Sequence, residues 1–229
     1  MRRLLFGAAI LVAIAVFLAL GVWQVERRAW KLDLIARVDA RLAAAPVPAP
    51  GPADWPGLTR DADEYKRVEA SGRFLDDREV ATLAVTARGS GYWVVTPLVT
   101  PDFTVLVNRG FVPQDRRDPA TRREGQPEGP VTVSGLLRLS EPGGGFLRRN
   151  DPADGRWYSR DVAAIAADRG LEGPVAPYFI DADATANPGG LPEGGLTVVR
   201  FRNAHLSYAL TWFALAAGLA YLAARARRR

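Results

Sequence analysis

Two long uncharged stretches, one near each end of the chain, most constrain what this sequence can fold into. Residues 4–23 (LLFGAAILVAIAVFLALGVW) and 206–224 (LSYALTWFALAAGLAYLAA) contain no charged side chain. A helix rises about 1.5 Å per residue, so each stretch can cross a hydrocarbon core of about 30 Å. Aromatic residues that suit the headgroup level of a bilayer lie at Trp23, Tyr208, Trp212 and Tyr221. The pattern predicts a membrane protein in which two transmembrane helices flank one extramembrane domain.

The first stretch could also be a cleavable signal peptide. Arg2 and Arg3 precede the apolar run, and residues 19–21 (Ala-Leu-Gly) resemble a small-x-small cleavage site. The run is longer than the apolar core of a signal peptide, which favours a retained span. A mature N-terminus at Val22 would contradict that interpretation.

Charges around the two spans predict the orientation. Four arginines follow the second span, whereas Arg200 and Arg202 precede it. Basic residues around the first span argue the other way, but a segment as long as this one can translocate regardless of its charge. We therefore expect both termini in the cytoplasm and the domain in the periplasm, at a bacterial cell inner membrane. The scarcity of Lys, and the absence of a transit peptide ahead of Leu4, make the mitochondrial inner membrane the less favoured location.

Composition excludes several kinds of site. The chain has no Cys and one His, so it can form no disulfide, thiolate zinc site or iron–sulfur cluster, and imidazole chemistry can come only from His205. The net charge of +5 comes from the tails: when the six arginines at the two ends are left out, the rest of the chain has 24 basic and 25 acidic residues. A nearly neutral domain does not favour nucleic-acid binding.

The region between the spans divides into a helical extension, a linker and a β-rich domain. Apolar residues at helical spacing predict an amphipathic extension over 24–45, and a proline-rich run predicts a stiff linker over 46–56. The expected arrangement is an N-terminal tail and first span over 1–23, a domain over 57–204, a second span over 205–224 and a basic tail over 225–229.

Short alternating runs rich in β-branched and aromatic residues predict strands. These runs cover residues 65–74, 79–86, 92–99, 103–109, 131–139, 178–181 and 197–201. The turn at 100–102 (Thr-Pro-Asp) favours antiparallel pairing, and Ser159 is expected to cap a short helix over 161–168. The predicted domain is therefore α+β, with mainly antiparallel β structure.

Familiar catalytic and metal-binding patterns are incomplete. Residues 181–187 alternate oxygen side chains as a calcium loop does, but Ala186 and Pro192 stand where a turn glycine and a bidentate carboxylate are needed. An Asx-rich surface turn is the favoured interpretation. Asp76 and Asp77 are adjacent, so a shared acid–base role is disfavoured and they are expected to be turn residues. A periplasmic hydrolase therefore lacks an evident nucleophile and acid–base set.

Two residues remain as candidate ligand-binding groups. His205 precedes the second span, with Tyr208 and Trp212 three and seven positions later on the same helical face. An imidazole there could be an axial haem ligand, or an interfacial polar residue that reaches toward water. Arg109, within Asn108-Arg109-Gly110, could be an exposed cation at a strand end or a bidentate partner for a carboxylate or propionate.

Seven segments in order resemble the Surfeit-locus (SURF/Shy) family, whose members assist the assembly of cytochrome c oxidase. They are 21–31 (GVWQVERRAWK), 64–68 (EYKRV) with Gly72 and Phe74, 95–98 (VTPL), 105–113 (VLVNRGFVP), 177–183 (PYFIDAD), 187–190 (NPGG) and 203–212 (NAHLSYALTW). Phe111 stands where Trp is expected and Ala204 where Asn is common. Neither departure removes a charged or ligating group.

The resemblance implies a membrane-anchored assembly factor without catalytic turnover, which holds or delivers haem a to the core subunit of a haem-copper oxidase. His205 matches the family's histidine at the second span, the position proposed to contact haem. The expected partners of the protein are the core subunit of the oxidase, the haem a synthesis machinery and the lipid bilayer. A ligand-binding sensor is an alternative, but the tail from Arg225 is too short for a transmitter module.

We hypothesise supporting roles for further residues. Tyr208 and Trp212 are expected beside the haem, and Arg109, or the stripe Gln24/Arg27/Lys31, at its propionates or at the partner subunit. Partner or structural roles are expected for the motif residues Trp23, Gln24, Arg27, Trp30, Lys31, Asn108 and Gly110.

Overall fold

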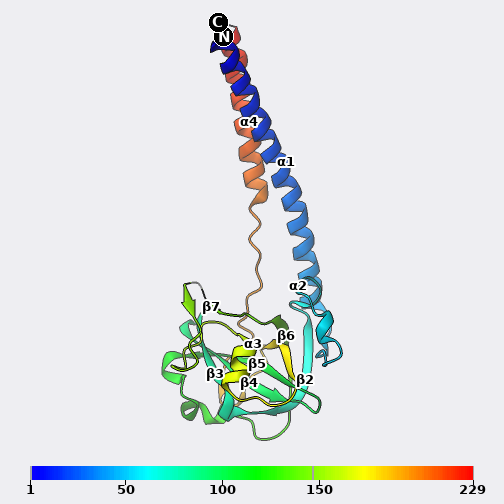
Figure 1. Ribbon diagram of the computed structural model, residues 1–229, viewed down its shortest axis with the longest axis vertical. Coiled ribbons are helices and arrows are strands. Elements are labelled where there is room, and N and C mark those ends of the chain that lie inside the picture. Colours follow the sequence, from blue (N-terminus) through cyan, green and yellow to red (C-terminus); the bar gives the residue numbers. More distant parts are fainter. Residues whose placement is uncertain (1, 146, 229) are drawn as a thin grey trace. The chain divides into compact units, whose positions relative to one another are not determined.

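A computed structural model describes residues 2–145 and 147–228, and the chain forms two compact units (Figure 1). One unit combines Met1–Asp39 with Val199–Arg229 and holds two long helices. The other, Ala40–Val198, holds the strands. The two ends of the sequence therefore form one unit, and the middle forms the other.

The first unit is a pair of helices that run side by side in opposite directions (Figure 1). Helix α1 spans Arg2–Ala43, and α4 spans His205–Arg227. Both helices are long and apolar enough to cross a membrane. Helix α1 continues beyond residue 23 through most of the segment predicted as an amphipathic extension, and it ends shortly before Pro46 because proline cannot continue a helix.

The second unit is a seven-stranded sheet that closes into a ring. Its strands are β1 (Val47–Pro48), β2 (Arg67–Phe74), β3 (Val80–Thr86), β4 (Gly89–Val99), β5 (Thr104–Pro113), β6 (Val131–Leu139) and β9 (Val175–Ala182). Their order is β1-β2-β6-β9-β5-β4-β3, and an additional pairing of β2 with β4 closes the ring. The predicted strands over 65–74, 79–86, 92–99, 103–109, 131–139 and 178–181 are confirmed.

The sheet is mixed, so the prediction of a mainly antiparallel domain is confirmed only in part: antiparallel pairings predominate, but two pairings are parallel. Strand β9 pairs antiparallel with β6 but parallel with β5, and β1 pairs parallel with β2. The long connection over 140–174 returns the chain so that β9 inserts between β5 and β6. Turn residues indicate hairpins between consecutive strands, but they carry no information on such a distant insertion.

Strand β5 forms the centre of the domain, because residues 104–112 are all buried. Val105 and Val107 pack into one apolar cluster with residues of β2, β6 and β9, including Val68, Leu137 and Ile180. Leu106 faces the opposite side and packs with Phe179 and Ile165. Side chains alternate across a strand, so a strand that is covered on both faces reads as a continuous apolar run.

The proline-rich segment predicted as a linker lies against the sheet. Val47 and Pro48 pair with Val68 and Glu69 of β2. The Pro50 carbonyl accepts hydrogen bonds from the Tyr178 hydroxyl at 2.8 Å and from the Trp55 indole at 3.0 Å.

Short elements complete the domain. They are helices α2 (Arg60–Asp63) and α3 (Val162–Asp168), strands β7 (Gly144–Gly145) and β8 (Arg148–Arg149), and the 3-10 helices Trp55–Gly57, Asp76–Arg78, Gln114–Arg116, Pro119–Gly125 and Pro188–Gly190.

Two local predictions are wrong. Asp161, rather than Ser159, caps α3, since its side chain accepts from the Ala164 N–H at 3.2 Å. Ser159 donates instead to the Glu141 carbonyl. Residues 197–201 form no strand, because β propensity yields a strand only where a neighbouring strand is available for pairing.

Gly72 permits the β2–β4 closure, since a Cβ there would collide with the Val99 carbonyl. We expect Gly72→Ala to lower the free energy of unfolding of the domain by about 1–3 kcal/mol, as overpacking does. This loss corresponds to a fall in Tm of several degrees, measured by near-UV circular dichroism on the full chain in detergent. The control is Gly57→Ala, where the added Cβ meets open space. Equal Tm values for the two variants would contradict the closure role.

Candidate functional site

The single histidine lies against the other long helix. His205, the first residue of α4, places its Nδ1 2.8 Å from the Gln24 side-chain oxygen of α1. An amide oxygen can only accept a hydrogen bond, so the ring nitrogen facing it is the donor. A neutral ring in this arrangement carries its free lone pair on Nε2. The structure thus joins two residues that the sequence analysis had singled out separately.

Neighbouring contacts fix the register of the helix pair around these residues. Trp212 stacks on Phe17, with ring centroids 5.6 Å apart. Gly21 lies so close to the Phe213 ring that any larger side chain would displace it. Phe17, Gly21 and Gln24 are spaced four and three residues apart, so they share one face of α1. This face presents Gln24 to α4.

The rest of the stripe on α1 continues beyond Gln24. Lys31 lies over the Phe201 ring at 4.7 Å, and Arg27 lies over the Trp30 ring at 3.9 Å. Cation–π contacts of this kind hold a charged head group in place without neutralising it. The two cations therefore keep their hydrogen-bonding capacity for another group.

Exposed aromatic residues accompany the pair. The Tyr208 side chain is 52% exposed, and Trp23 is exposed to a similar extent. Tyr208 therefore differs from Trp212, which is engaged in the helix contact. Of the residues predicted to share one helical face with His205, Trp212 thus packs against α1, whereas Tyr208 is exposed.

Arg109 is buried, so the expectation of an exposed cation at a strand end is wrong. The residue is 2% exposed. Its guanidinium donates to Asp76 at 2.9 Å, to Asn187 at 3.2 Å and to the Gly125 carbonyl, and it lies over the Phe74 ring. Burial lowers the pKa of Arg109, and the nearby Asp76 offsets that effect only in part. The guanidinium of Arg109, a candidate bidentate partner for an external carboxylate or propionate, is therefore hydrogen-bonded to groups of the domain itself.

The neighbours of Arg109 also have structural partners. The Asn108 amide donates to Asp181 at 2.7 Å, while its oxygen accepts from the Gly110 N–H at 3.2 Å. Gly110 has a φ of +136°, and a Cβ there would collide with the Glu193 backbone. Phe111 exchanges two backbone hydrogen bonds with Glu193. The Asn-Arg-Gly motif thus joins β5 to the segment that follows β9.

A buried ion-pair cluster centres on Asp181, the last but one residue of β9. Its carboxylate accepts from Arg138 at 2.8 Å and from Arg160 at 3.0 Å, besides the Asn108 amide. Arg138 also pairs with Glu64, and Arg160 with Glu141. Burial lowers the pKa of Arg138, but the charge of Asp181 and the bond to Glu64 outweigh this and raise it overall.

Sequence reasoning missed this cluster. Asp181 was interpreted as part of a surface turn, yet it is buried. The surface-turn interpretation applies to Asp183 instead, whose side chain accepts from the Thr185 N–H. One available signal was Arg138, a charged residue within the otherwise apolar strand segment 136–139 (LLRL).

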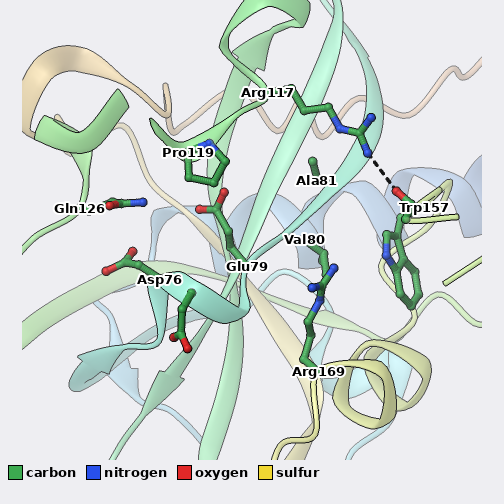
Figure 2. A pocket seen from close by; sticks show the side chains of 11 residues that line it. Asp76, Glu79, Val80, Ala81, Arg117, Pro119, Gln126, Trp157 and Arg169 are labelled. Atoms are coloured by element: carbon green, nitrogen blue, oxygen red, sulfur yellow. Dashed lines mark hydrogen bonds between the residues drawn. The ribbon is translucent and has the colours of Figure 1, made fainter. Parts of the chain in front are cut away.

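A cavity of about 500 Å³ lies beside β3 and is lined by charged residues (Figure 2). Figure 2 shows Asp76 and Gln126 on one side and Arg117 and Trp157 on the other. Arg117 donates to the Gly155 carbonyl at 2.9 Å. Burial raises the pKa of Asp76 above its usual value, although Arg109 opposes the rise.

Two of the three carboxylates that line this cavity serve internal ion pairs. Asp76 pairs with Arg109, and Glu79 is bound by both terminal nitrogens of the buried Arg122. Among the described residues, no group of three or more His, Asp or Glu side chains is placed to hold a metal ion.

Comparison with known proteins identifies the relatives of this chain. The model of the SURF1 family matches residues 11–217. The chain belongs to this family. It is 40% identical to Surfeit locus protein 1 of Homo sapiens over 222 residues, which cover 89% of this chain and 71% of that protein. It is also 36% identical to Surfeit locus protein 1 of Takifugu rubripes, over 89% of each chain, and 37% identical to a SURF1-like protein of Monosiga brevicollis, over 93% and 84%.

The family match includes most of both long helices and the whole domain. It therefore covers the helix pair around His205 and Gln24 and the cluster around Asp181 alike. The resemblance found from the seven sequence segments is confirmed.

The Asp181 cluster should make domain stability depend on acid pH. Burial alone would raise the pKa of Glu141, but hydrogen bonds and charge from Arg160 outweigh it and hold that pKa below its usual value of 4.5. A lowered folded-state pKa stabilises the domain above pH 4.5, and this contribution is lost as pH falls through the folded-state value. We expect Glu141→Gln to be less stable than wild type at neutral pH, with the difference shrinking below pH 4.5.

Urea unfolding of the full chain at a series of pH values measures this dependence. Glu128→Gln, at an exposed loop position, is the control and should follow the wild-type profile. A constant difference between wild type and Glu141→Gln across the acid range would contradict the assignment.

Proposed function

We propose that this protein is a membrane-anchored assembly factor for a haem-copper cytochrome c oxidase, which binds and positions haem a for the core subunit. The observation that carries the proposal is the hydrogen bond between His205 and Gln24. It holds the only imidazole of the chain on a pair of apolar helices. Family membership supports the assembly role, because the matching relatives are Surfeit locus proteins.

The residues of the helix pair fit a haem as cargo. Nε2 of His205 makes no hydrogen bond to any described residue, so its lone pair can serve as an axial ligand. The exposed Tyr208 ring offers an apolar surface for the macrocycle. A single imidazole ligand suits reversible binding, which transfer to another subunit requires.

Cations on the same helix suit the haem propionates. Arg27 and Lys31 keep free donors while resting on aromatic rings. We assign the propionates, or an acidic surface of the partner subunit, to this stripe rather than to Arg109, whose guanidinium is bound inside the domain.

The two apolar helices serve as the membrane anchor in this proposal. Residues 4–23 and 206–224 span the cell inner membrane, both termini lie in the cytoplasm, and the domain lies in the periplasm. The partners of the protein are the core oxidase subunit, the haem a synthesis machinery and the surrounding lipid.

The role requires no catalytic turnover by this chain. Handing over a preformed haem breaks no covalent bond, so a reversible ligand and a docking surface suffice. The paired carboxylates around Asp76 and Glu79 agree with a binding protein rather than a hydrolase.

Replacing the histidine tests the haem proposal. We expect His205→Ala, purified from membranes that make haem a, to retain its fold but to carry only background haem, because the ligand nitrogen is lost. The readouts are pyridine haemochrome absorbance per chain and cytochrome c oxidation by membranes of a complemented deletion strain. Ser207→Ala, on the same turn of α4, is the matched control. Wild-type haem content in His205→Ala would contradict the proposal.

Reporter fusions test the orientation. We expect alkaline phosphatase, which is active only outside the cytoplasm, to be inactive when fused after Arg229 and active when inserted after Glu128 in the domain. Green fluorescent protein at the same positions should give the inverse pattern. An active phosphatase after Arg229 would reverse the proposed topology.

A further inference from the structure

Gln24 is the one side chain hydrogen-bonded to the His205 ring among the described residues. The two residues are 181 positions apart, so the contact depends entirely on the helix pair. A neutral imidazole exists as two tautomers, and the hydrogen bond made by one nitrogen decides which form is present. Because the Gln24 oxygen accepts, the pairing selects the form with the proton on Nδ1.

We infer that Gln24 is a positioning residue: it holds His205 in the Nδ1–H tautomer and leaves Nε2 as the nitrogen offered to a haem iron. The inference rests on the proposed function for the identity of the ligand, but not for the tautomer. Metal-binding histidines in general depend on a partner at the second ring nitrogen, which fixes the ring and raises its basicity.

The packing of α1 supports this role, because Gln24 cannot easily turn away. One turn earlier, Gly21 meets the Phe213 ring, and one turn before that Phe17 stacks on Trp212. One heptad later, Lys31 rests on Phe201. These contacts flank Gln24 on the same face of the helix and hold its side chain toward α4.

The chemistry of Gln24 also suits a releasable cargo. An amide is neutral, so the pair adds no charge at an apolar boundary. A carboxylate would accept the same hydrogen bond but would draw the proton more strongly and make Nε2 a stronger donor to iron. The amide thus orients the ring while leaving it a moderate ligand.

Because the chain has one histidine, labelling it with ¹⁵N-histidine gives a single imidazole to observe. We would record ¹⁵N spectra of the full chain in lipid bilayers at about pH 8.5, well above the ordinary histidine pKa of about 6.5. The expected wild-type spectrum shows Nδ1 protonated and Nε2 unprotonated. Gln24→Leu should shift the ring toward the Nε2–H form that free imidazole favours, whereas Gln24→Glu should keep the proton on Nδ1.

The same variants are then titrated with haem a in detergent and followed by absorbance. Loss of the partner should weaken haem binding by about 10–100-fold in Gln24→Leu, as removal of such partners does elsewhere, with affinity retained in Gln24→Glu. Glu26→Leu makes the same kind of polar-to-apolar change at an exposed position of α1 and should match wild type in both measurements.

The outcomes separate this inference from the proposed function. An unchanged tautomer in Gln24→Leu, or a shifted tautomer with wild-type haem affinity, would overturn the role of Gln24. Haem affinity that is equally high in His205→Ala would instead overturn the haem proposal, while a tautomer that depends on Gln24 would still support the pairing.

Discussion

A buried carboxylate, Asp181, ties together the centre of the domain. Its partners come from β5 through Asn108, from β6 through Arg138, and from the segment before α3 through Arg160. An unpaired charge in this position would cost several kcal/mol. The position of β9 between β5 and β6 brings all three partners to Asp181, so we interpret the cluster as one determinant of the strand order.

In the helix pair, too, polar and close contacts select one arrangement of the elements, but fewer polar groups take part. Apolar side chains alone would let α1 and α4 slide or rotate, because they pack about equally well at many registers. The close approach at Gly21 and the Gln24–His205 hydrogen bond select one register. The proposed ligand-binding group is therefore oriented by the same contact that aligns the helices.

Much of the fold follows from local patterns. The absence of charge predicts both long helices, and alternation predicts six of the seven strands of the sheet, with small shifts at their ends. The errors arise where distant partners decide the outcome. Residues 197–201 have strand propensity but no strand to pair with, and Asp161 rather than Ser159 is positioned at the N-terminus of α3.

For the candidate site, the sequence by itself determined the residue types: one histidine at the start of an apolar helix, and glutamine and cations on a motif near the first span. It could not determine that Gln24 meets His205, that Arg109 is buried, or that Asp181 gathers two arginines. Periodicity and composition report which face of an element is apolar, which is a local property. The identity of the residue opposite depends on register between segments far apart in the chain, and only the tertiary structure decided that.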